Sequence, residues 1–185
     1  MSRWWSATAA VGICCLCVVW LAVGPTAVAA QGPAPVTVTE FNGSGTAADP
    51  YVVTNVSELQ AIDQSLGANY TLGGDIDGSG TVGWFGGEGF SPVGNSTHSF
   101  TGSLDGSEYR ILNVTINRSA AGPGANGDDA ALFGYADGAT ISNLTVVDAS
   151  ISAGGGGDGS DGTGQNGGFG GYGCGLIAVS NAITV

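Results

Sequence analysis

The sequence is most constrained by a hexamer that occurs twice. Residues 111–116 read ILNVTI and residues 141–146 read ISNLTV, 30 positions further along. In each copy the apolar residues change parity at the Asn, which a strictly alternating strand does not do. Asn tolerates a left-handed backbone, so Asn113 and Asn143 are predicted to be bends between two short strands. A strand, a bend and a strand at a fixed interval predict one coil of a β-solenoid, with both Asn side chains stacked inside it.

The first 30 residues are predicted to be a secretory signal peptide. Arg3 supplies the positive start, the apolar run at 9–23 is short for a membrane span, and residues 27–29 (AVA) offer a small-x-small cleavage pattern. An uncleaved N-terminal anchor is the alternative. Cleavage would leave one thiol, Cys174, so no disulfide framework is expected. The protein is therefore expected to be secreted or displayed on the cell surface.

The chain is strongly acidic. Beyond residue 30 it carries 15 Asp and Glu residues against two Arg, and the chain has no Lys. This balance excludes nucleic acid and anionic membrane surfaces as electrostatic partners. It is typical of proteins from high-salt cells, because carboxylates hold water while salt screens their repulsion. A Gly-rich secreted repeat without salt adaptation is the alternative.

The rest of the chain divides into five segments by composition and pattern. They are a flexible N-terminal segment (31–50), a capping strand and helix (51–69), β-helix coils (70–153), a Gly-rich loop (154–175) and the start of a further coil (176–185). Residues 176–185 align with residues 132–141, just before the second hexamer. We therefore predict an all-β, incomplete or truncated array that ends in mid-coil.

One short helix is predicted near the start of the array. Ser57 and Gln60 have the spacing of a capping box, and Gly67 is the stop signal. Leu59 and Ile62 lie on one face of this helix. Such an amphipathic helix would cover the open end of the first coil, whose strand edges would otherwise stay unpaired.

Longer stretches resemble a known family. Residues 100–117 and 131–152 are similar to secreted β-helix repeat proteins that carry the GLUG motif (Gly-Leu-uncharged-Gly), and residues 51–80 are similar to their lead-in. The motif occurs at 131–134 (ALFG) and 175–178 (GLIA), each with one Gly replaced by Ala. The resemblance implies a right-handed parallel β-helix at a cell surface or in the medium, adhesin-like in role and without shared catalytic residues.

A calcium site is the one metal site that the sequence suggests. Asp75, Asp77 and Ser79 space their oxygens as a calcium loop does, but the bidentate Glu of an EF-hand is missing. A polar turn that closes the strand is the favoured alternative. No other cofactor is expected, and the single His98 excludes a His-rich zinc site.

Asn-x-Ser/Thr sequons are numerous, which agrees with secretion. They begin at Asn42, Asn55, Asn69, Asn95, Asn113, Asn117 and Asn143. The glycosylation candidates are Asn42, Asn55, Asn69 and Asn95, of which Asn42 and Asn95 are the best acceptors. The two bend residues are expected to stay unmodified.

Two classes of function fit these features. The first is a non-catalytic surface protein for adhesion or matrix interaction, whose partners are glycans, other surface proteins, or a second copy at the open C-terminal coil. The second is a polysaccharide lyase or hydrolase with a site between Arg110 and the loop at 119–129, since such enzymes also use β-helices. Reactive groups are sparse in this sequence, which favours the first class.

Overall fold

The computed structural model describes residues 41–119, 128–156 and 175–181. These residues form mostly strands and few helices, in agreement with the predicted all-β class. The elements are β1 (Tyr51–Val53), α1 (Val56–Ala61), the 3-10 helix η2 (Ile62–Gln64), β2 (Asn69–Leu72), β3 (Ile76–Asp77), the 3-10 segment η3 (Ser79–Gly86), β4 (Ser103–Asp105), β5 (Arg110–Leu112), β6 (Thr115–Asn117), β7 (Phe133–Asp137), β8 (Thr140–Ser142), β9 (Thr145–Val147), β10 (Ser150–Ser152) and β11 (Ile177–Asn181).

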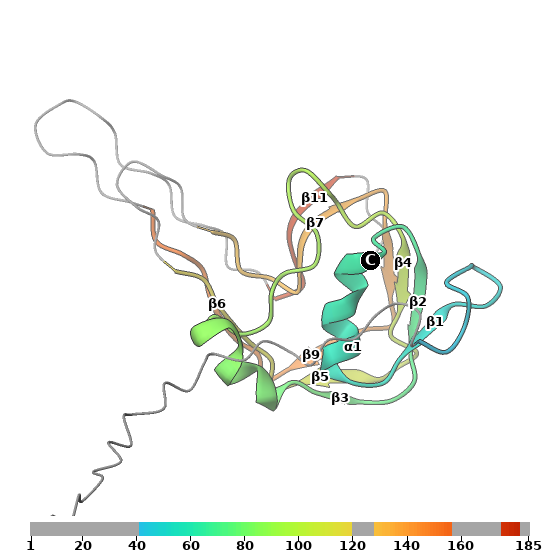
Figure 1. The fold of residues 1–185 in the computed structure, drawn as a ribbon, viewed down its shortest axis with the longest axis horizontal. Helices are drawn as coiled ribbons and strands as arrows, with labels where there is room; N and C mark the ends of the chain where they lie inside the picture. Colours follow the sequence, from blue (N-terminus) through green and yellow to red (C-terminus); the bar gives the residue numbers. More distant parts are fainter. Residues whose placement is uncertain (1–40, 120–127, 157–174, 182–185) are drawn as a thin grey trace, which may run out of the picture.

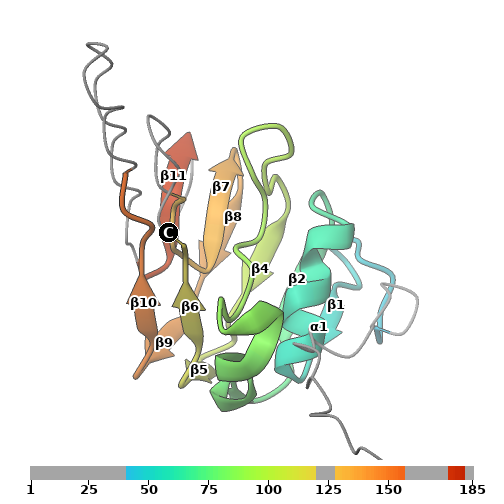
Figure 2. The same ribbon diagram turned by 60° about the vertical axis from the view of Figure 1, so that its left-hand side comes forward.

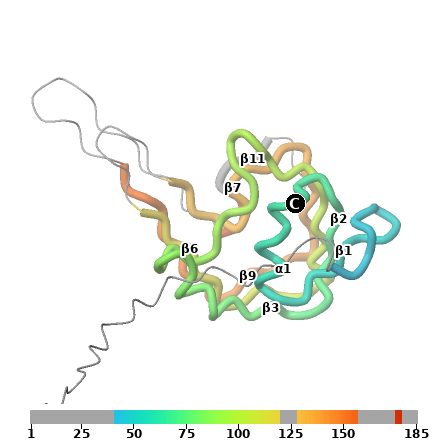
Figure 3. Tube along the Cα trace, in the orientation of Figure 1, coloured from blue at the N-terminus to red at the C-terminus, as the bar shows by residue number. Residues whose placement is uncertain are grey.

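All pairs between these strands are parallel, and they build narrow sheets ordered β1-β2-β4-β8, β3-β5-β9, β6-β10 and β7-β11. From β2 onward, strands that follow one another along the chain lie in different sheets. The chain therefore returns to each sheet in turn (Figure 3). We call one circuit a pass: β2 and β3 belong to the first pass, β4 to β6 to the second, β7 to β10 to the third, and β11 begins the fourth. Figure 2 shows the strands of successive passes side by side, from β1 to β11.

Aromatic rings run through the interior along the stack. The ring centroids of Tyr51 and Tyr70 are 5.6 Å apart, those of Tyr70 and Phe100 are 6.4 Å apart, and those of Phe100 and Phe133 are 4.9 Å apart. Each ring contributes large apolar area and packs against the next pass in a tilted arrangement. Burial raises the pKa of Tyr70 to about 12, and its hydroxyl donates to the Ser65 carbonyl at 2.9 Å.

Aliphatic side chains fill the rest of the interior. Leu104, Ile111 and Ile116 of the second pass are fully buried. Their register partners in the third pass differ in burial. Ile141, opposite Leu104, is also buried. Val146 and Ile151, opposite Ile111 and Ile116, are only half-buried. Within the described residues β9 and β10 are the outermost strands of their sheets, so no described strand covers Val146 and Ile151.

The two hexamers do not stack on each other, so the expected 30-residue coil is wrong. Ile111 pairs with Val146, 35 residues later, and Ile141 pairs with Leu104, 37 residues earlier. The first hexamer joins β5 to β6, whereas the second joins β8 to β9. The motif is a corner, and the chain uses it at two different corners of its circuit. The 30-residue spacing between the two copies is therefore shorter than the 35 to 37 residues of one pass.

The helix cap lies upstream of the predicted one, so the Ser57–Gln60 capping box is wrong. Asn55 is the N-cap residue, and its Oδ1 accepts from the Glu58 amide at 2.9 Å. Glu58 Oε2 in turn accepts from the Thr54 amide at 2.6 Å. The spacing Asn-x-x-Glu is that of a capping box, but Glu58 accepts from the residue before the N-cap and not from the N-cap amide itself. Asn55 has the extended backbone that the N-cap position needs.

The helix buries the face that the sequence predicts and lies over one end of the stack. Leu59 and Ile62 are fully buried. Gln60, expected in the cap, instead bonds through its amide to the main chain of Ser91, at 2.8 and 2.9 Å. In Figure 1 α1 lies inside the outline that the strands trace, and in Figure 2 it stands beside β1 and β2.

The two end segments are described in part. In the segment predicted at 31–50, the Asn42 carbonyl accepts from the Val52 amide at 2.8 Å, and Phe41 is buried. At the other end Ile177 pairs with Phe133, which agrees with the predicted alignment of 176–185 with 132–141. The predicted signal peptide and most of the Gly-rich loop lie outside the described residues.

Candidate functional site

The bend asparagines tie each pass to the preceding one on the outer surface. Asn113 and Asn143 have φ values of 56° and 53°, so the predicted left-handed bends are confirmed. Asn143 Nδ2 donates to Asp105 Oδ1 at 3.0 Å, and Asn113 Nδ2 donates to Asp77 Oδ1 at 3.4 Å. We call these two contacts the corner pairs. They link residues 38 and 36 positions apart in the sequence.

Both bend side chains are exposed, so the expectation that they stack inside the coil is wrong. The reason lies in the alternation around the corner. Val114, which follows Asn113, is buried, and Leu144, which follows Asn143, packs against the core. The apolar neighbour occupies the inner side of the corner, and the Asn side chain is left on the outer side.

Each corner pair stands on an Asp-Gly dipeptide of the preceding pass. Asp105 ends β4 and lies opposite Ser142, so Gly106 lies beneath Asn143. A Cβ atom at Gly106 would collide with the Asn143 carbonyl. The other corner repeats the arrangement, with Gly78 against the main chain of Val114. The Asp accepts the amide hydrogen of the Asn, and the Gly makes room for the main chain of the next bend.

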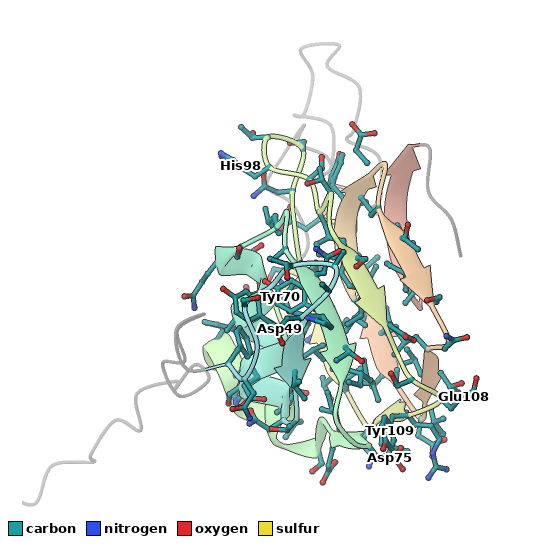
Figure 4. All side chains as sticks on the ribbon, turned by 90° about the vertical axis from the view of Figure 1, so that its right-hand side faces the viewer. Asp49, Tyr70, Asp75, His98, Glu108 and Tyr109 are labelled. Carbon is teal, nitrogen blue, oxygen red and sulfur yellow. The ribbon has the colours of Figure 1, made fainter. Side chains whose placement is uncertain are left out.

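An ion pair also ties the first two passes together. Arg110 Nη2 lies 2.7 Å from Asp75 Oδ2, and the Arg110 amide donates to Asp75 Oδ1 at 2.9 Å. The side chains are 54% and 38% exposed, so solvent screens the pair. Figure 4 shows Asp75 close to Tyr109 and Glu108, at the opposite end of the molecule from His98. The guanidinium that the enzyme hypothesis needs is thus bound by a carboxylate.

The calcium candidate has its carboxylates occupied by the protein itself. Both oxygens of Asp75 accept from Arg110. Asp77 Oδ1 accepts from the Ser79 amide at 2.9 Å, and Oδ2 accepts from the Ser79 hydroxyl at 3.0 Å. In the described part of the chain no cluster of three or more His, Cys, Asp and Glu side chains could hold a metal ion. The contacts of Asp77 with Ser79 are those of a polar turn, whereas the oxygens of Asp75 bind Arg110 of the next pass.

Hydrogen bonds keep these outer carboxylates charged. The pKa of Asp105 lies below its usual value, chiefly because the Asn143 amide donates to it. The Ser79 main chain lowers the pKa of Asp77, and the Arg110 guanidinium lowers the pKa of Asp75. These carboxylates therefore keep their negative charge to a lower pH than free carboxylates do.

The glycosylation candidates differ in how their acceptor nitrogen is used. Asn42, Asn55 and Asn95 are exposed. Asn69 is half-buried, its Nδ2 donates to the Gly45 carbonyl at 3.1 Å and its Oδ1 accepts from Ser103 at 2.7 Å. Asn55 Nδ2 makes a long contact of 3.5 Å, while its Oδ1 caps the helix. The structure thus favours Asn42 and Asn95 over Asn69.

Asn95 also borders a shallow hollow that sequence reasoning missed. The hollow has a volume of about 310 Å³ and is lined by Asp63, Gln64, Leu66, Asn95 and His98. Asn95 Oδ1 accepts from the Thr97 and His98 amides, which holds the sequon in an exposed turn. The lining comes from segments about 30 residues apart, and no local pattern signals such a meeting.

Exposed apolar residues are a second feature that the sequence did not signal. Among the described residues, the exposed large hydrophobic side chains are Val82, Phe85 and Tyr109, at 64%, 44% and 40%. The first two belong to η3, where a continuation of the first coil was expected. The described helices include none long and apolar enough for a membrane span.

Comparisons with known proteins find similar segments in two much longer relatives. No family model and no solved structure match the chain. Over 119 residues it is 42% identical to halomucin from Haloquadratum walsbyi, a match that covers 60% of this chain and 1% of halomucin. Over 116 residues it is 30% identical to a putative Gly-rich membrane protein from Evansella cellulosilytica, covering 61% of this chain and 13% of that protein. The chain thus spans a small part of the length of these relatives, and the GLUG resemblance stays a prediction.

Proposed function

We propose that this protein is a non-enzymatic protein of the cell surface or the extracellular medium that serves adhesion or matrix interaction. The observation that carries the proposal is the 42% identity to halomucin over 119 residues, joined to a fold made of stacked passes. The name of the second relative, a membrane protein, supports the same location. Such a protein acts through its surface area, so it needs a rigid and repetitive framework.

The framework is a right-handed parallel β-helix. Parallel pairing in every sheet, with register partners 34 to 37 residues apart in the three-pass region, is what stacked coils require. Crossover connections between parallel strands of one sheet are almost always right-handed, which supports that hand. The helix α1 closes one end of this stack.

The surface is that of an acidic, glycosylated protein adapted to high salt. The net charge of −12 supports this, together with the similarity to a protein of Haloquadratum walsbyi. Exposed acceptors at Asn42 and Asn95 support glycosylation. Glycans or other surface proteins are the proposed partners of the outer strand faces, which present Ser103 and Thr140 side by side.

The outermost pass is the proposed site of self-association. β8, β9 and β10 have unpaired edges within the described residues, and the row Leu144, Val146 and Ile151 beside them is half-buried. A second copy that pairs with these edges would complete both the hydrogen bonds and the apolar row.

The proposal is tested by location and by binding without turnover. An antibody against the folded chain should label intact producing cells or precipitate the protein from their medium. Purified protein should bind cells or isolated surface glycans and leave the glycan chain lengths unchanged. Arg110→Ala should bind as the original does. Labelling that requires cell lysis, or glycan cleavage that Arg110→Ala abolishes, would contradict the proposal.

A further inference from the structure

An apolar patch on η3 lies open to solvent beside a glycosylation sequon. The patch consists of Val82, Trp84 and Phe85. Val82 and Phe85 are 64% and 44% exposed, and Trp84 is half-buried against the core. Val82 and Phe85 lie three residues apart in η3, and exposed apolar patches mark surfaces for a partner or ligand.

The backbone holds Phe85 at the surface at a conformational cost. Phe85 has φ 48° and ψ 39°, a left-handed conformation that is rare for a bulky residue. Gly86 and Gly87 follow it with φ values of 77° and 100°, which Gly adopts without steric cost. Phe90, five residues later, is by contrast fully buried. The local backbone is therefore strained at the residue whose ring is exposed, whereas the ring of Phe90 is buried.

Asn117 reaches the turn that carries this ring. It ends β6, is exposed, and opens the sequon Asn-Arg-Ser. Its main-chain amide donates to the Glu88 carbonyl at 2.7 Å, and its Nδ2 lies 3.4 Å from the Gly87 carbonyl. Gly87 in turn donates to the Trp84 carbonyl at 2.9 Å. The acceptor nitrogen of the sequon thus sits against the turn that contains Phe85.

The contact of Asn117 leaves its nitrogen able to carry a sugar. A glycosylated amide keeps one hydrogen, and 3.4 Å is a long distance for a bond that must be kept. Asn69 and Asn143 differ, since their Nδ2 atoms donate at 3.1 and 3.0 Å to a carbonyl and a carboxylate. Of these three asparagines, Asn117 has the longest hydrogen bond at Nδ2, so its side-chain nitrogen is the most available for glycosylation.

We propose that Asn117 is N-glycosylated and that the first sugar of its glycan covers Phe85 and Val82. A pyranose ring has one face of C–H groups that packs on an aromatic ring, while its hydroxyls stay in water. This occupant is tethered within reach of the patch, so it pays little entropy to bind there. The inference rests on the proposed function, because only an exported protein meets a surface glycosylation pathway.

The test starts with the full chain exported from an N-glycosylating host. Mass spectrometry of glycopeptides should find Asn117 occupied. Asn117→Gln should bind more of an apolar dye and melt about 2–4 °C lower than the glycosylated original. Ser119→Ala, which destroys the same sequon, should behave alike. Asn95→Gln, which removes a sequon in the exposed turn at 95–98, should leave dye binding unchanged.

A double-mutant cycle ties the effect to the ring. Phe85→Gly relieves the left-handed strain and deletes the ring, so Asn117→Gln should no longer lower the Tm in that background. Occupancy at Asn95 with none at Asn117 would overturn the inference and leave the proposed function standing. An occupied Asn117 whose loss changes neither dye binding nor Tm would also overturn it, as would concentration-dependent association through the patch. A chain that is never exported would contradict the proposed function itself.

Discussion

Asn143 Nδ2 donates to Asp105 Oδ1 at 3.0 Å, from the bend of one pass to the strand end of the preceding pass. The neighbouring Gly106 lacks the Cβ atom that would collide with the Asn143 carbonyl. Asp77, Gly78 and Asn113 repeat the arrangement at another corner. An Asp-Gly dipeptide therefore receives the Asn of the next pass, and this repeated contact helps to hold the passes in register.

The left-handed bend at Asn143 should dominate the energetics of this corner. Asn143→Gly keeps the bend but loses the amide bond, whereas Asn143→Ala also brings the cost of a left-handed Cβ, roughly 1–2 kcal/mol. We expect Asn143→Ala to lose more unfolding free energy than Asn143→Gly in urea titrations. Asn143→Asp, which tolerates the bend but faces Asp105 with a second charge, should fall below Asn143→Gly. Equal stability of the Gly and Ala variants would contradict the account of the bend.

Stability should fall in acid through the outer carboxylates. The pKa values of Asp75, Asp77 and Asp105 are lower in the folded protein than in an unfolded chain. Their contribution is therefore complete above the unfolded value of about 3.9 and is lost as the pH drops through the lower folded values. Thermal melts from pH 6 to pH 2 should show the loss. The Asp105→Asn variant should lose less thermal stability between pH 6 and pH 2 than the original protein does. An equal loss in the variant would argue against Asp105 as a source of the pH dependence.

Two isoleucines in register test whether the third pass forms the end of the stack. Ile116 is fully buried in β6, and its partner Ile151 in β10 is half-buried. Ile116→Ala should cost about 2–5 kcal/mol of unfolding free energy, and Ile151→Ala clearly less, because a half-exposed side chain leaves no closed cavity. Chemical denaturation of both variants at low protein concentration makes the comparison. Equal losses would mean that something covers Ile151 as fully as β10 covers Ile116.

The corrected helix cap gives a further matched pair. Asn55→Ala removes the oxygen that accepts from the Glu58 amide, and we expect a loss of about 1 kcal/mol. Ser57→Ala should change the unfolding free energy little, since Ser57 lies inside the first turn of α1 and is not its cap. Urea titration of both variants checks this. A larger loss of unfolding free energy for Ser57→Ala than for Asn55→Ala would support the Ser57–Gln60 capping box instead.

Local patterns in the sequence predicted the bends and the buried face of the helix, but they did not predict the register between passes. The hexamers correctly predict left-handed bends at Asn113 and Asn143, because one residue type suits that backbone. They misled about the pass length, because a corner motif can serve at any corner. The alignment of residues 176–185 with 132–141 succeeded, because it compares the same strand in successive passes.

The polar contacts were beyond sequence reasoning for a related reason. Asp75 and Arg110 meet only because one pass lies on the next, 35 residues later. The signal that was available is the Asp-Gly dipeptide that recurs 36 to 38 residues before Asn-x-Thr, at Asp77 and at Asp105. Asp-Gly is also a common turn dipeptide, so its presence does not by itself indicate contact with the next bend.

The central claim, that successive passes stack in this register, is tested most directly by cysteine cross-linking. With the four native Cys replaced by Ser, a Ser103→Cys and Thr140→Cys pair joins register partners on adjacent parallel strands, within disulfide reach. The account predicts rapid oxidation of this pair in the folded protein and none for Arg110→Cys with Thr140→Cys, which would align if the hexamers stacked. Cross-linking of the second pair in place of the first would contradict the fold as described.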